Sequence, residues 1–120
     1  MSRDHRKLKV FVLADAAVVK VYASTRAMPV AERFGLQAQI RRAAVSVPAN
    51  IVEGSTRESA REYVYFLSIA LGSASEAHYL LGLAQRLGLL PDADAAALDS
   101  QYDNLIRGLS ALIRALKPRR

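Results

Sequence analysis

Apolar residues recur at three- and four-residue steps along most of the chain, which is the period of a helix with one buried face. The recurrence divides into four segments, and we expect helices at about residues 7–26, 31–53, 59–87 and 92–117. No segment shows sustained alternation of polar and apolar residues, so no β-sheet is expected. Short connections should make consecutive helices antiparallel neighbours. The predicted fold is an all-α, antiparallel up-down-up-down four-helix bundle, built by residues 1–120 as a single domain.

Local signals mark where these helices begin, bend and end. The first should end before Pro29, because a residue that precedes proline avoids the helical region. Pro48 falls inside the second segment, but the apolar period continues in phase on both sides, so we predict one helix kinked at Pro48. Gly54 then suits a left-handed C-terminal cap. The third helix has two possible starts, since Ser55 and Ser59 each open a capping box.

The first and third segments differ in how their apolar residues are spread. The first has one stripe, formed by Leu8, Phe11, Ala14, Val18, Val21 and Tyr22. The third is apolar on nearly every side, with one set formed by Tyr63, Leu67, Leu71, Ala74 and Leu81 and another by Tyr65, Ile69, Leu83 and Leu87. A helix in a four-helix monomer should keep one polar face, so this excess predicts a subunit interface. Gly72 in mid-helix predicts another helix approaching closely there.

The composition narrows the possible chemistry. Hydrophobic residues make up 52% of the chain, aromatic residues 7%, and there is no Cys, which excludes disulfides and thiolate metal sites. Two histidines do not make a zinc site, and His78 follows Glu76 at the wrong spacing for a di-iron bundle. We expect His78 on the core-facing side of its helix, as a structural residue with a hydrogen-bond partner. No metal and no cofactor is expected.

The N-terminal region bears a weak likeness to a signal peptide, but Asp15 and Lys20 interrupt its apolar run. We therefore expect this segment to be an amphipathic helix of the mature protein. No stretch of about 18 uncharged apolar residues exists, so no membrane span is expected. The predicted protein is cytoplasmic.

A polar stripe borders the apolar face of the second segment. It consists of Gln39, Arg42, Ser46, Asn50 and Glu53, and the third segment adds Ser73 and Glu76. One interpretation is a catalytic pocket in which Glu53 and Glu76 act as acid and base. The other is a buried hydrogen-bond network that fixes helix register, with Arg42 paired to one of these glutamates. Because no nucleophile, proton shuttle or glycine-rich phosphate loop accompanies the stripe, we favour the network and expect neither catalytic residues nor an enzyme.

The net charge of +6 draws attention to the basic residues. Many of them gather near the two termini: Arg3, Arg6, Lys7, Lys9, Lys117, Arg119 and Arg120. Both termini of an up-down bundle of four helices lie at the same end, so the two clusters should form one basic surface. Such a surface could hold a phosphate backbone with little base specificity. The alternative is a pair of charged, solvated chain ends without a ligand.

A dense set of residues at fixed spacing runs from Glu32 to Gly88. They are Glu32-Arg33-Phe34-Gly35-Leu36, Gln39, Ile40-Arg41-Arg42-Ala43-Ala44, Ser46-Val47-Pro48-Ala49-Asn50-Ile51-Val52-Glu53-Gly54, Tyr63, Phe66-Leu67-Ser68-Ile69-Ala70, Gly72-Ser73, Glu76 and Leu87-Gly88. This set resembles the bacterial four-helix-bundle proteins encoded in intervening sequences of 23S ribosomal RNA genes. The resemblance covers essentially the whole chain and is densest in this stretch.

This resemblance implies a four-helix bundle that assembles into a homo-oligomeric ring, a pentamer, and it implies no catalytic residues. It also implies a relation to the accessory proteins of diversity-generating retroelements, whose rings bind nucleic acid and a reverse transcriptase. Three hypotheses remain. The basic termini and the resemblance favour an oligomer that binds RNA or DNA, the apolar third helix favours a scaffold or accessory ring for a partner enzyme, and the polar stripe leaves an enzyme using Arg42, Asn50, Glu53 and Glu76.

Overall fold

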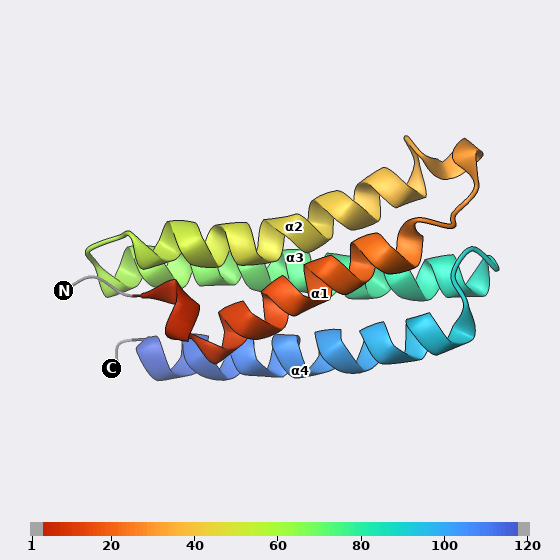
Figure 1. Cartoon of the computed structure of the whole chain (residues 1–120). Coiled ribbons are helices and arrows are strands. Elements are labelled where there is room, and N and C mark those ends of the chain that lie inside the picture. The colour runs from red at the N-terminus through yellow and green to blue at the C-terminus, as the bar shows by residue number, and fades with distance from the viewer. Residues whose placement is uncertain (1–3, 118–120) are drawn as a thin grey trace.

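The computed structural model describes residues 4–117, which fold into four long helices that run side by side (Figure 1). These are α1 (Lys9–Thr25), α2 (Leu36–Ser55), α3 (Ala60–Arg86) and α4 (Asp92–Leu116), with short 3₁₀ helices η1 (His5–Lys7) and η2 (Val30–Glu32). No strand occurs within residues 4–117. The bundle measures 47 × 22 × 21 Å. The predicted all-α four-helix fold is confirmed.

The four helices form a square in cross-section. Both α1 and α3 pack against α2 and α4, whereas α1 and α3 do not contact each other. The most extensive packing is between α2 and α3. Small buried residues permit this close approach: Ala43, Ala44, Ala70, Ala74 and Ala77. Within the described residues, no helix is long and apolar enough to cross a membrane.

The core is a single cluster to which each helix contributes one buried stripe. Its largest fully buried side chains are Val21, Ile40, Val47, Ile51, Leu67, Leu98, Tyr102, Leu105 and Leu109. The hydroxyl of Tyr102 is buried without a hydrogen-bond partner among the described residues. Burial raises the pKa of this phenol, because the charged form would lose its hydration.

The second helix begins later than the sequence predicts. The predicted start at residue 31 is wrong, because residues 30–32 form the separate turn η2 and α2 begins at Leu36. Gly35, at φ −103° and ψ −114°, lies outside the helical region and breaks the chain direction there. The carboxylate of Glu32 then accepts a hydrogen bond from the backbone N–H of Leu36 at 3.2 Å, which caps the new helix.

The prediction that Gly54 is a left-handed cap is also wrong. Gly54 lies inside α2 and is buried, and a Cβ there would come within 2.9 Å of the Phe66 Cβ. This glycine is therefore needed for close packing of α2 on α3. Among the described residues, the glycine with positive φ is Gly88, at 74°. It ends α3 in a Schellman motif, in which the N–H of Leu89 donates to the carbonyl of Ala84 at 2.8 Å.

Two other local signals have clear outcomes. Pro48 lies within a helix that continues on both sides of it, as predicted, while the bend expected there stays a prediction. Ser59 is the N-cap of α3, since its hydroxyl accepts a hydrogen bond from the Glu62 N–H at 3.1 Å. Of the two predicted capping boxes, the one that opens with Ser59 therefore begins the helix.

Candidate nucleic-acid interface

The predicted basic surface at the chain ends is formed in part. The N-terminal turn η1 and the C-terminal end of α4 lie at the same end of the bundle (Figure 1), as the topology requires. Lys7, Lys9 and Lys117 are exposed there, and none forms an ion pair within residues 4–117. The other predicted members of the surface, Arg3, Arg119 and Arg120, lie outside the described residues.

Arg6, the remaining member, is compensated by its neighbour. Its guanidinium lies 3.0 Å from a carboxylate oxygen of Asp4 and donates to the second oxygen at 3.1 Å. This hydrogen bonding holds the pKa of Asp4 below its usual range. Arg6 therefore adds less positive potential than the sequence suggests.

A second basic surface, which the sequence analysis did not single out, lies at the opposite end of the bundle. We call it the arginine–aromatic groove, an open hollow of about 740 Å³ where the end of α1 meets η2 and the first half of α2. Its arginines and aromatic residues are Tyr22, Arg33, Phe34, Arg41 and Arg42. Arg26 lines an adjoining hollow that shares Arg33 and Arg41. The Phe34 side chain is 90% exposed, which is unusual for so large an apolar group.

Arg41 is held in the groove by neutral partners. Its Nε donates to the Thr25 hydroxyl at 3.0 Å and one terminal nitrogen donates to the Tyr22 carbonyl at 3.4 Å. The guanidinium also lies over the Tyr22 ring, 4.4 Å from its centroid. None of these contacts neutralises the charge, and within the described part of the chain neither Arg41, Arg26 nor Arg33 forms an ion pair. The groove therefore keeps a positive potential that is available to an anion.

The predicted polar stripe forms a hydrogen-bond network between α2 and α3. The hydroxyls of Ser46 and Ser73 lie 2.8 Å apart, and the Asn50 amide donates to the Ser46 hydroxyl at 3.0 Å. Arg42 pairs with Glu76 at 3.4 Å, as one of the predicted alternatives requires. These two charged side chains are 66% and 44% exposed, so the expectation of a buried charge pair is wrong. The network joins the helices near the surface.

The two glutamates of the catalytic alternative are not brought together. Glu53 pairs at 3.3 Å with Arg57, one turn further along the chain. The register places neighbouring Gly54 beside Phe66, which is ten residues and therefore roughly 15 Å from Glu76 along α3. Gln39 is exposed and makes no hydrogen bond to the other members of the stripe within residues 4–117.

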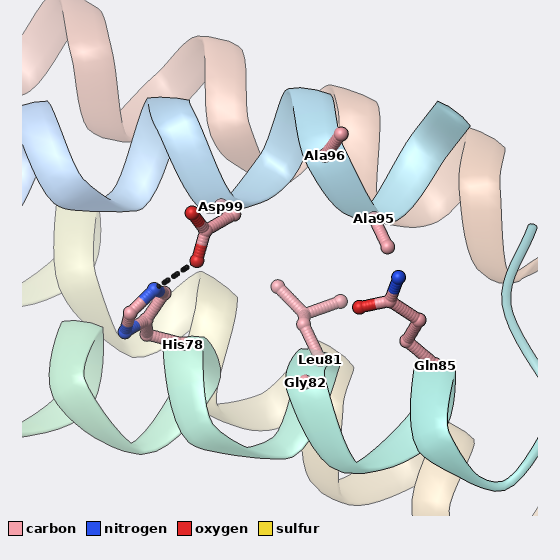
Figure 2. A pocket seen from close by; sticks show the side chains of 7 residues that line it. All are labelled: His78, Leu81, Gly82, Gln85, Ala95, Ala96 and Asp99. Carbon is pink, nitrogen blue, oxygen red and sulfur yellow. Dashed lines mark hydrogen bonds and ion pairs between the residues drawn. The ribbon is translucent and has the colours of Figure 1, made fainter. Parts of the chain in front are cut away.

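His78 has the partner that was expected but a different location. Its Nε2 lies 2.6 Å from a carboxylate oxygen of Asp99, so the pair links α3 to α4 (Figure 2). The ring is half-exposed at the edge of this interface, so the expected core-facing position is wrong. The adjoining pocket, lined also by Leu81 and Gln85, holds about 160 Å³, which is small for a cofactor. No group of three or more metal-ligating side chains is found in residues 4–117.

The comparisons with known proteins agree with the fold and with the resemblance seen in the sequence. The family described as 23S rRNA-intervening sequence protein matches residues 6–111. This chain belongs to that family. A crystal structure of a protein of unknown function from the S23 ribosomal protein family of Bacteroides thetaiotaomicron VPI-5482 is similar, with a TM-score of 0.81 and 23% identity. The alignment covers 88% of this chain and 98% of that one.

These matches place the chain in a family without specifying an activity. At 23% identity the structural similarity shows a shared fold, and the function of that protein is itself unknown. None of the curated proteins matches the chain. Neither the family description nor the structural neighbour indicates a catalytic activity.

Proposed function

We propose that this family member is a cytoplasmic, non-enzymatic homo-oligomer that binds RNA or DNA with low sequence specificity through basic surfaces. The observation that carries the proposal is the arginine–aromatic groove, where Arg33 and Arg41 form no ion pair within residues 4–117 and the Phe34 ring is exposed. Guanidinium groups bind phosphates, and aromatic faces stack on bases of any sequence. This combination suits a single-stranded segment, whose bases are free to stack.

The groove offers a different role to each side chain. Arg41 is fixed by Thr25 and Tyr22, so it presents its charge with little loss of conformational freedom on binding. Arg33 and Arg26 extend the positive charge toward the end of the bundle. Phe34, next to Arg33 in the chain, is exposed and offers a stacking surface. The lysines near η1 and the end of α4 would form a separate contact at the opposite end.

The proposal is tested by measuring binding to labelled single-stranded RNA, structured RNA and duplex DNA at two salt concentrations. Affinity should fall steeply as salt rises, and single strands should bind best. The Arg26→Gln, Arg33→Gln double variant should lower the slope of log affinity against log salt by roughly one to one and a half units. A matched double variant at the other end, Lys7→Gln with Lys9→Gln, shows which basic surface contributes. Unchanged affinity and slope in the Arg26, Arg33 variant would remove the groove from the proposal.

A substitution of Phe34 tests the contribution of stacking separately from that of charge. Phe34→Leu keeps an apolar side chain but removes the aromatic face, so affinity for single strands should fall about five- to tenfold while the salt slope stays the same. Leu87→Ala, at an exposed position that lines neither hollow, is the control and should change neither quantity. Equal effects of the two substitutions would argue against stacking.

A scaffold for a partner enzyme is the second candidate function. It is favoured by the apolar side chains that lie uncovered on α1, η2 and the first half of α2: Val12, Val19, Tyr22, Val30, Phe34 and Val45. Surfaces of this kind are typical of protein interfaces. An oligomer that binds none of the three nucleic acids at low salt would favour this function over the first.

A further inference from the structure

A second, smaller hollow adjoins the arginine–aromatic groove at the end of the bundle where α1 passes into α2 (Figure 1). We call it the arginine hollow. It holds about 250 Å³ and shares Arg33, Gln37 and Arg41 with the groove. Arg26 lines the arginine hollow but not the groove. The hollow is smaller than the roughly 300–1,000 Å³ of pockets that enclose a drug-sized ligand, so it suits one small group rather than a whole nucleotide.

Three guanidinium groups and no carboxylate line the arginine hollow. Within residues 4–117, none of Arg26, Arg33 and Arg41 forms an ion pair. The one acid between residues 26 and 41 is Glu32, which does not line the hollow. The Glu32 carboxylate instead caps α2 through the N–H of Leu36. Because like charges gathered without a counter-charge repel one another, an anion in the hollow would relieve this repulsion as well as be attracted.

The backbone groups that would repel an anion at this end of the bundle already have partners. The C-terminal end of α1 presents carbonyls that carry partial negative charge. The Thr25 carbonyl accepts a hydrogen bond from the Gln37 amide at 2.8 Å, and the Tyr22 carbonyl accepts one from Arg41 at 3.4 Å. The second terminal nitrogen of Arg41 makes no hydrogen bond within the described part of the chain. Arg41 is therefore held in place with donors left for a ligand.

The number of cations favours the end of a nucleic-acid strand over its middle. A phosphate within a strand has two free oxygens and one negative charge, whereas a terminal phosphate has three free oxygens and roughly 1.5 to 2 negative charges at pH 7. Three guanidinium groups match the terminal phosphate in both respects. The exposed Phe34 ring lies in the adjoining groove, where a base next to that phosphate can stack.

We infer that the arginine hollow binds the terminal phosphate of a single-stranded nucleic acid whose first bases lie in the arginine–aromatic groove. Because Arg33 and Arg41 line both hollows, phosphate and base meet one continuous surface. Recognition of an end requires no particular base, which agrees with low sequence specificity. The inference rests on the proposed function and names the part of the strand that is recognised.

Three single-stranded RNAs of one sequence test the inference by fluorescence anisotropy, with the label in mid-strand so that both ends stay free. One strand carries a 5′-phosphate, one a 3′-phosphate and one hydroxyl groups at both ends. One of the two phosphorylated strands should bind about tenfold more tightly than the unphosphorylated strand, and the other serves as its control for added charge. Equal affinity of the three strands, or an equal gain from either phosphate, would overturn the inference and leave the proposed function standing.

Arg26→Gln is the most selective substitution, because Arg26 is exposed and lines the arginine hollow alone of the two. It should remove most of the preference for the phosphorylated strand and weaken binding of the unphosphorylated strand by about threefold or less. Arg114→Gln makes the same change in charge at an exposed position outside both hollows, and it should leave the preference unaltered. Circular dichroism checks that both variants keep their helix content. A preference that survives Arg26→Gln in full would overturn the assignment to this hollow.

A nucleoside monophosphate offers the same phosphate chemistry as a strand end, so competition separates these two sources. The monophosphate that corresponds to the recognised end should displace the strand only at about a hundredfold higher concentration, because it lacks the further bases that stack in the groove. Displacement at an equal concentration would overturn the strand end as the ligand in favour of a free nucleotide. Failure of all three strands to bind at low salt would overturn the proposed function and the inference together.

Discussion

Helices α1 and α4 pack against each other, yet their outward faces are opposite in character. On α4 the side turned from the core carries Ser100, Asn104 and Arg107, and within the described part of that helix no large apolar side chain is exposed. On α1 the corresponding side carries Val12 and Val19, with Asp15 between them. The two helices meet the same core, so packing within the chain cannot explain the difference. The uncovered apolar side chains of α1 are therefore the ones that the proposed functions would place against another macromolecule.

The largest expected effect is the difference in unfolding free energy between truncating a buried side chain of α4 and truncating an exposed side chain of α1. Leu105 is fully buried, so Leu105→Ala should lower the free energy of unfolding by about 3 kcal/mol through lost burial and a cavity. Val12→Ala removes methyl groups that are already exposed to solvent and should cost under about 0.5 kcal/mol in the isolated chain. Urea denaturation at a protein concentration low enough to dissociate the proposed oligomer measures both. A Val12→Ala cost above about 1.5 kcal/mol under these conditions would mean that its face is covered within the chain.

Two glycines, Gly54 packed inside the bundle and Gly72 exposed on it, should respond in opposite ways to substitution by alanine. Gly54→Ala should destabilise the chain by about 1–3 kcal/mol, because the new Cβ would lie 2.9 Å from the Phe66 Cβ. A Cβ at Gly72 would meet nothing within 4 Å, so the close approach of another helix predicted there does not occur within the chain. Gly72→Ala should therefore stabilise the dissociated chain by about 1 kcal/mol through helix propensity. In the proposed oligomer the same substitution should weaken association, because the apolar excess of this helix predicts a subunit interface. Thermal unfolding measures the stability of the dissociated chain, and light scattering measures association. A Gly72→Ala protein that is more stable and also associates more strongly would contradict this prediction.

Removing the buried hydroxyl of Tyr102, on α4, should have a smaller effect on the free energy of unfolding. Tyr102→Phe removes a hydroxyl that has no hydrogen-bond partner among residues 4–117, so the free energy of unfolding should rise by about 1 kcal/mol. Because burial raises the pKa of this tyrosine, the wild type should lose stability as the pH rises above the phenol's ordinary value near 10. The phenylalanine variant should lack that part of the alkaline loss. Denaturation at pH 7 and at pH 11 measures both quantities; a destabilised variant would reveal a hydrogen bond to the phenol.

The smallest effect is expected on the polar outer face of α4. Arg107 pairs with Asp103 one turn away, and both are substantially exposed. Arg107→Gln should therefore change the free energy of unfolding by about 0.5 kcal/mol or less and leave the mass of the oligomer unaltered. If light scattering showed dissociation, the α4 face would belong to the subunit contact, and the contrast between α1 and α4 would disappear.

Local patterns predicted most of the bundle because each of them records a local requirement. Three- and four-residue spacing records which side of a helix is buried, and it gave four helices and no sheet. The Ser59 capping box and the stripe that joins Ser46 to Ser73 depend on residues a few positions apart, or on neighbouring antiparallel helices. The arginine–aromatic groove was not predicted, because it combines Tyr22 with Arg33 and Arg41, which meet when the chain turns back between α1 and α2.

The sequence by itself determined that this protein is a four-helix bundle with more apolar surface on its third helix than one chain can bury. The tertiary structure alone decided which glycine is left-handed and which is packed, because Gly54 and Gly88 differ in their neighbours. It also decided that Val12 and Val19 stay uncovered, although they recur with the same helical spacing as the buried Ala14 and Val21. Tyr22, which the sequence placed in the buried stripe of α1, is exposed as well, because α2 and α4 cover the side that carries Ala14 and Val21.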